Sequence, residues 1–92
     1  MNIGPTVLNK YKDEIPKNAV FIGRPSMWGN PFVIGIDGDR DTVICKYEEW
    51  LHSNPAMIHA VKRMLAGKDL VCFCSPNPCH GDVLLSIANS PM

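Results

Sequence analysis

The segment that decides the fold spans residues 70–82 and reads LVCFCSPNPCHGD. Its first residues are apolar, and Cys72 and Cys74 are two apart, so a strand places both thiols on the same face of a sheet. The two prolines that follow exclude helix and sheet for a few residues, and this turn brings Cys79 and His80 back beside the end of the strand. A helix is expected from about Cys79 onward. The segment therefore predicts a strand, a turn and a helix that gather three of the four cysteines of the chain.

The composition indicates one folded domain. The chain has 92 residues, which is enough for one domain, residues 1–92, with a single modest core. Nine basic and nine acidic residues give a formal net charge of zero, so no broad basic surface is indicated, although a local patch could still bind nucleic acid. No apolar run is long enough to span a membrane, and no signal peptide is recognisable. We therefore expect a cytoplasmic protein without a membrane partner, whose cysteines bind metal, act in catalysis or are simply buried. The oligomeric state is not indicated.

Apolar patterns upstream of this segment predict two strands and two helices. The strands are expected at residues 6–9 and 19–22. The first helix is expected to be capped by Asp39 or Asp41, and the second helix is expected within residues 54–67. The side chains expected to be buried in these two helices are Val43, Ile44, Cys45, Tyr47, Trp50, Leu51, Met57, Ile58, Val61, Met64 and Leu65.

The order of these elements predicts a small α/β domain. If the strands at residues 19–22 and 70–74 are parallel neighbours, a right-handed crossover through the two helices joins them. Ligands of open α/β sheets bind outside the carboxyl ends of the strands. The loop at residues 24–32 and the turn at residues 74–80 follow those two ends. We therefore predict a Rossmann-like sheet of parallel strands, about three helices, and one pocket formed by both loops.

The loop after the second strand reads GRPSMWGNPF over residues 23–32, and its two prolines and two glycines exclude regular structure. Its side chains are suited to a ligand: Arg24 could bind an anion such as phosphate and Trp28 could stack on a base. Ser26 and Asn30 could hydrogen-bond to a polar edge of the ligand. The alternative is that Trp28 simply fills one end of the core. We favour ligand binding because a turn rarely requires all four of these side chains.

The cluster of cysteines and histidine admits several chemical interpretations. A zinc site would use three thiolates and one imidazole, from Cys72, Cys74, Cys79 and His80, which makes zinc the candidate cofactor. An iron–sulfur cluster fits less well, because the gap between the cysteines is short and the terminal order is His-Gly-Asp. A third interpretation is a ligand site at a helix N-terminus, with His80 and Asp82 as general acid or base. The last is that Cys72 and Cys74 are small buried side chains of a central strand.

Two motifs of the chain resemble those of a known family. They are GRPSxWGNPF at residues 23–32 and CFCxPxxCHGD at residues 72–82. This family of small bacteriophage and bacterial proteins is catalogued as a domain of unknown function, and the resemblance extends from Val7 to about Ala88. It implies a phage-encoded protein of the host cytoplasm and an α/β fold similar to Rossmann-type nucleotide-binding domains. It implies no particular reaction.

These observations lead to one functional hypothesis and one alternative. The hypothesis is a small α/β protein that binds a nucleotide-like or phosphate-containing molecule and acts on it through nucleotide or N-glycosidic-bond chemistry. The expected ligand-binding residues are Arg24, Ser26, Trp28, Asn30 and Cys79, and the expected catalytic residues are His80 and Asp82. The alternative is a zinc-stabilised module that binds protein or nucleic acid without turnover. Whether the protein is an enzyme stays open at this point.

Overall fold

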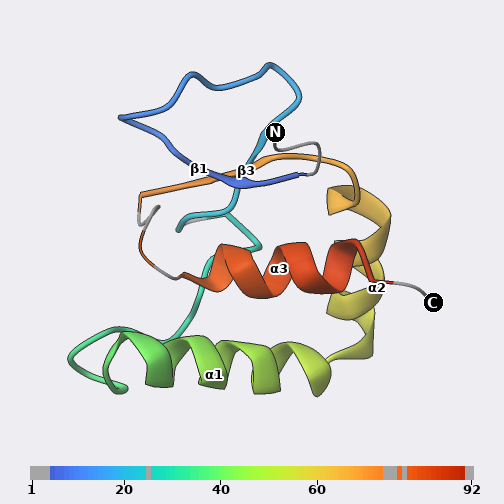
Figure 1. Cartoon of the computed structure of the whole chain (residues 1–92). Coiled ribbons are helices and arrows are strands. Elements are labelled where there is room, and N and C mark those ends of the chain that lie inside the picture. Colours follow the sequence, from blue (N-terminus) through green and yellow to red (C-terminus); the bar gives the residue numbers. More distant parts are fainter. Residues whose placement is uncertain (1–4, 25, 74–76, 78, 91–92) are drawn as a thin grey trace.

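The computed structural model describes residues 5–24, 26–73, 77 and 79–90. The elements along the chain are β1 (Val7–Asn9), β2 (Val20–Phe21), α1 (Arg40–His52), α2 (Pro55–Leu65), β3 (Leu70–Cys72) and α3 (His80–Ala88). Figure 1 shows their arrangement. The predicted succession of strand, strand, helix, helix, strand, helix is confirmed.

The three strands form one parallel sheet with β3 in the middle, in the order β1-β3-β2. Val20 lies opposite Leu70 in β3, and Leu8 lies opposite Val71. All three residues of β3 are buried, as expected for the central strand of a parallel sheet. The expectation that β2 and β3 are parallel neighbours joined through two helices is therefore confirmed. As a result, the segments that follow β2 and β3 leave the sheet at the same edge.

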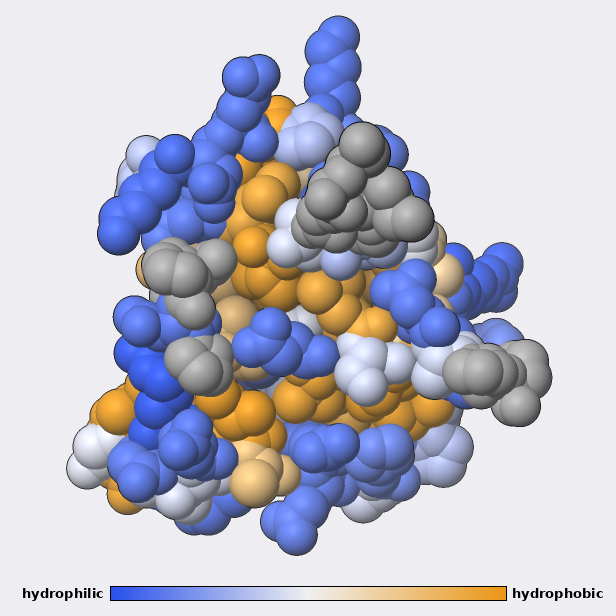
Figure 2. All heavy atoms as spheres, viewed as in Figure 1, coloured by the Kyte–Doolittle hydropathy of each residue, from blue (hydrophilic) through white to orange (hydrophobic). Residues whose placement is uncertain are grey.

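The helices stack on the sheet in layers. Helix α3 contacts β1 and β3 with one side and α1 with the other, so it lies between the sheet and α1 (Figure 1). This position explains why α3 is apolar on several faces, with buried side chains that include Val83, Leu84 and Ile87. Helix α2 packs against both α1 and α3. On the face seen in Figure 2, hydrophobic residues reach the surface between hydrophilic side chains.

The helix boundaries follow the expected signals. Asp39, not Asp41, is the N-cap of α1, and its carboxylate accepts a hydrogen bond from the Thr42 N–H at 2.8 Å. Hydrogen bonds from the Thr42 side chain and backbone hold the pKa of Asp39 below its usual value. Helix α2 begins with Pro55 at its first position. It ends at Leu65 before Gly67, whose φ of +76° suits glycine.

Two of the burial predictions are wrong. Met64 is 50% exposed and Cys45 is exposed. Successive residues of an α-helix are about 100° apart, and α2 turns Val61 and Leu65 inward, so Met64 is left at the edge of its apolar stripe. Helix α1 buries Val43, Tyr47 and Leu51, and Cys45 lies well away from that line. No helix in the described ranges is both long and apolar enough to cross a membrane.

Candidate functional site

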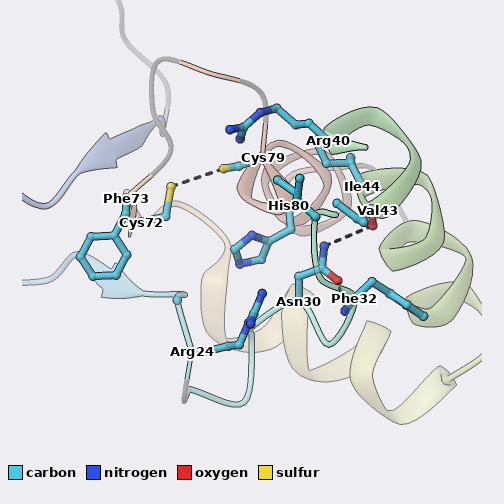
Figure 3. Close-up of a pocket in the computed structure, with 12 residues that line it drawn as sticks. Arg24, Asn30, Phe32, Arg40, Val43, Ile44, Cys72, Phe73, Cys79 and His80 are labelled. Atoms are coloured by element: carbon cyan, nitrogen blue, oxygen red, sulfur yellow. Dashed lines mark hydrogen bonds between the residues drawn. The ribbon is translucent and has the colours of Figure 1, made fainter. Parts of the chain in front are cut away.

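A pocket of about 280 Å³ lies at the carboxyl ends of β2 and β3 (Figure 3). Both sequence motifs contribute to its wall, which confirms that the strand order brings them together. A third contribution comes from α1 and the segment before it. The lining residues are Gly23, Arg24, Asn30, Phe32, Ile34, Arg40, Val43, Ile44, Cys72, Phe73, Cys79 and His80.

The loop at residues 23–32 is fixed to α1 by two hydrogen bonds. The Tyr47 hydroxyl donates to the carbonyl oxygen of Trp28 at 2.6 Å, and the Asn30 side-chain amide donates to the carbonyl oxygen of Val43 at 3.2 Å. The Asn30 side-chain oxygen accepts from the Phe32 N–H at 2.9 Å. Tyr47 is fully buried, and burial raises its pKa, so it stays a protonated donor. Asn30 therefore lines the pocket, while its amide N–H and its side-chain oxygen are used in hydrogen bonds to Val43 of α1 and to Phe32 of the loop.

Two residues expected to bind ligand lie elsewhere. Trp28 is only 4% exposed and belongs to the hydrophobic core. Ser26 has a buried hydroxyl oxygen with no hydrogen-bond partner among the described residues. Neither residue is among the described residues that line the pocket. Burial favours the core interpretation of Trp28, and the stacking role of Trp28 stays a prediction that this placement does not support.

Arg24 lies at the pocket and is exposed to solvent. A Cβ atom added at Gly29 would lie 3.0 Å from Arg24 Cγ and 3.3 Å from the Arg24 backbone. Glycine at position 29 therefore lets the loop fold closely against Arg24. Arg24 forms no ion pair with a carboxylate of the described residues. Its guanidinium can donate to an anion that enters the pocket.

His80 is buried beside Arg24 in the pocket wall (Figure 3). Its Nε2 lies 2.7 Å from the carbonyl oxygen of Ile22. A carbonyl oxygen only accepts, so the proton of the neutral ring is on Nε2, and Nδ1 carries a lone pair. Burial lowers the pKa of His80 and outweighs the hydrogen bond to Ile22, which acts in the opposite direction. The positive charge of Arg24 lowers this pKa further.

The lowered pKa of His80 predicts that the free energy of unfolding decreases as the pH falls below about 6.5, the ordinary pKa of histidine. The unfolded chain protonates His80 near its ordinary value of 6.5, whereas the folded protein resists protonation, so the unfolded state binds more protons in this range. The stabilisation that His80 contributes is full well above pH 6.5 and is lost as the pH falls through the pKa of His80 in the folded protein. Urea unfolding at a series of pH values measures this slope.

His80→Gln is the informative variant for this pH dependence, because a glutamine amide can also donate to the Ile22 carbonyl oxygen. We expect a shallower pH dependence in His80→Gln than in the wild-type protein. His59→Gln, at an exposed position of α2, is the matched control for the loss of an imidazole outside the pocket. If the free energy of unfolding of His80→Gln depended on pH as steeply as that of the wild-type protein, His80 would not be the source of the pH dependence.

The N-terminus of α3 is capped by the side chains of Cys79 and Asp82. The Cys79 N–H donates to Asp82 Oδ2 at 3.1 Å, and the Gly81 N–H donates to Cys79 Sγ at 3.3 Å. A Cβ atom at Gly81 would lie 2.9 Å from the side chains of Ile22 and Val7, so glycine lets α3 approach the sheet closely. Asp82 is exposed and is not among the described lining residues. It caps the helix, and its catalytic role stays a prediction.

The sulfur atoms of Cys72 and Cys79 lie 3.4 Å apart, and both cysteines line the pocket (Figure 3). Cys74, the third thiol of the predicted zinc site, lies outside the described residues. Within the described part of the chain, no group of three or more His, Cys, Asp or Glu side chains is arranged to hold a metal ion. His80 Nε2 is engaged with Ile22. Zinc binding stays a prediction, as does the iron–sulfur alternative.

Some residues of this pocket carry little signal in the sequence. Arg40, the first residue of α1, lines the pocket together with Val43 and Ile44, yet helical periodicity assigns this region only to the core. In the sequence, Phe73 stands out only as part of a motif, although it is 46% exposed and lines the pocket. The one available signal was its position directly after an apolar strand, where side chains reach the ligand edge of a sheet.

A second hollow, of about 580 Å³, lies at the junction of α1 and α2. It is lined by His52, Pro55, Ile58, His59, Lys62 and Arg63. Neither motif contributes to it, and it lies away from the carboxyl edge of the sheet. Its basic residues, Lys62 and Arg63, are therefore suitable positions for control substitutions.

Comparison with known proteins confirms the resemblance carried by the two motifs. The family model described as "Domain of unknown function (DUF4326)" matches residues 7–90. A relative from Enterobacteria phage T4, described as an uncharacterized 12.4 kDa protein in the nrdA-td intergenic region, is 34% identical over 87 residues. That alignment spans 90% of this chain and 76% of the phage protein. No solved structure matches. The chain therefore belongs to the DUF4326 family.

Proposed function

We propose that the pocket binds a small, phosphate-containing, nucleotide-like molecule. The main support for this proposal is the positive charge of the pocket wall. Arg24 and Arg40 line it, and none of the described lining residues is acidic, although the chain has as many acidic as basic residues. Guanidinium groups bind phosphate through paired hydrogen bonds. The position at the carboxyl edge of a parallel sheet is the usual place for such ligands in α/β domains.

Exposed aromatic rings beside the pocket supply a surface for a planar base. Phe73 is 46% exposed, and its ring centroid lies 5.4 Å from that of Tyr11 and 5.6 Å from that of Phe21. Tyr11 is 80% exposed. The amino group of Lys10 lies 5.1 Å from the centroid of the Phe21 ring. These rings support base stacking better than the buried Trp28 does, because a stacking residue needs an accessible face.

The size of the pocket limits the ligand. Small-molecule pockets usually have volumes of about 300–1,000 Å³, so a pocket of about 280 Å³ suits a mononucleotide or a smaller ligand. Any reaction on that ligand would depend on His80, the one predicted catalytic residue that lines the pocket. Its Nδ1 lone pair can accept a proton from the ligand or from a water molecule.

Isothermal titration calorimetry with the four 5′-ribonucleoside monophosphates, and with the matching nucleosides, tests this proposal. We expect at least one monophosphate to bind and its nucleoside to bind more weakly. Arg24→Gln should weaken monophosphate binding about 10- to 100-fold, because a hydrogen bond to a charged group contributes about 1.5–3 kcal/mol. Arg63→Gln, in the second hollow, is the matched control and should leave the affinity unchanged.

Three results would contradict the proposal. They are the absence of binding by all four monophosphates, equal affinity for nucleotide and nucleoside, and unchanged affinity in Arg24→Gln. A loss of affinity in Arg63→Gln alone would indicate that the ligand binds in the hollow between α1 and α2 instead.

A further inference from the structure

Two buried thiols face each other in the pocket wall. Cys72, at the end of β3, and Cys79, the N-cap of α3, have sulfur atoms 3.4 Å apart. A disulfide bond needs a separation of about 2.0 Å, so the two sulfur atoms must move about 1.4 Å closer to form one. The two residues belong to elements that are already packed against each other. A bond between them would therefore join two neighbouring elements of the fold.

The pocket gives a small reagent access to this pair. The two cysteines are only 2% and 4% exposed, but both line the pocket, where Arg24 and Arg40 also lie. The Gly81 N–H donates to Cys79 Sγ, and this sulfur lies at the N-terminus of α3. Both features favour negative charge on Cys79, because the helix N-terminus carries partial positive charge. Cys79 is therefore the better nucleophile of the pair.

We propose that Cys79 and Cys72 form a reversible, oxidation-sensitive dithiol that reacts with small peroxides entering the pocket. The Cys79 thiolate attacks one oxygen of hydrogen peroxide and the O–O bond breaks. The departing hydroxide takes up a proton to become water, and Cys79 becomes a sulfenic acid. Cys72 then attacks the Cys79 sulfur, the S–O bond breaks, and the departing hydroxide takes the Cys72 proton. Two thiols and one peroxide give one disulfide and two waters, and a dithiol reductant reverses the reaction.

The test uses the variant Cys45→Ser/Cys74→Ser, in which Cys72 and Cys79 are the remaining cysteines. Cys45 is exposed on α1, so its replacement prevents disulfide cross-linking of chains through this position. The purified variant is treated with hydrogen peroxide, and its free thiols and intact mass are measured. We expect the free thiols to fall from two per chain to none and the mass to decrease by two hydrogen atoms. Dithiothreitol should restore both thiols.

Two further variants in the same background assign the roles. With Cys72→Ser, peroxide should leave a sulfenic acid on Cys79 that dimedone traps. With Cys79→Ser, the Cys72 thiol should persist under the same treatment. Circular dichroism checks that each variant is folded, and the two-thiol variant remains decisive if either further variant unfolds. The proposal is overturned if both thiols survive a peroxide dose that oxidises Cys45 in the wild-type protein. It is equally overturned if the mass rises by oxygen atoms without formation of a disulfide.

Discussion

Replacing Trp28 with alanine is expected to lower the free energy of unfolding by about 3–5 kcal/mol. Trp28 is 4% exposed and packs in the hydrophobic core, so the substitution leaves a large cavity beneath the loop at residues 23–32. The hydrogen bond from Tyr47 to the Trp28 carbonyl oxygen uses the backbone and does not compensate for the lost packing. Urea unfolding followed by circular dichroism measures the change.

The neighbouring residue provides the control for this experiment. Met27 lies in the same loop and is 55% exposed, so Met27→Ala should change stability by no more than about 0.5 kcal/mol. A Trp28→Ala protein of nearly wild-type stability that fails to bind a nucleotide would contradict the core assignment. Such a result would restore the stacking role suggested by the sequence.

Replacing Leu65 with alanine is expected to lower the free energy of unfolding by about 2–5 kcal/mol, whereas Met64→Ala should change it by about 0.5 kcal/mol or less. Leu65 is fully buried in the core, and Met64 is 50% exposed on the same helix. The two positions are adjacent, and both substitutions place alanine, a good helix former, in α2. The difference between the two losses of stability therefore measures how much more deeply Leu65 is buried than Met64. Equal losses of stability, measured by urea unfolding, would contradict the orientation of α2.

The arrangement of the sheet follows from local features of the sequence. Short apolar runs predict the strands, and the two intervening helices make a parallel pairing of β2 and β3 the expected topology. Because parallel strands end at one edge, chain order alone brings Arg24 and His80 into the same pocket. The pocket was predictable because topology, not side-chain detail, places its main residues.

The role of each aromatic side chain in the site was less predictable. Trp28 and Phe73 both follow strands within motifs, and nothing in their spacing tells which one is buried. That difference depends on α1, whose Tyr47 holds the loop so that Trp28 turns into the core. Asp82 is a similar case, since the same carboxylate three residues after Cys79 suits either a capping box or a catalytic acid. Only the packed structure shows that it caps α3.

Whether the pocket at the carboxyl edge of the sheet binds a nucleotide is tested most directly by titrating the ¹⁵N-labelled protein with the tightest-binding ribonucleoside monophosphate and following the amide chemical shifts. We expect the largest shifts at Gly23, Arg24 and Phe73, which line the pocket at the carboxyl edge of the sheet. Amides of His59 and Arg63, in the hollow between α1 and α2, should stay unchanged. Shifts confined to that hollow, or no shifts at millimolar nucleotide, would contradict nucleotide binding in this pocket.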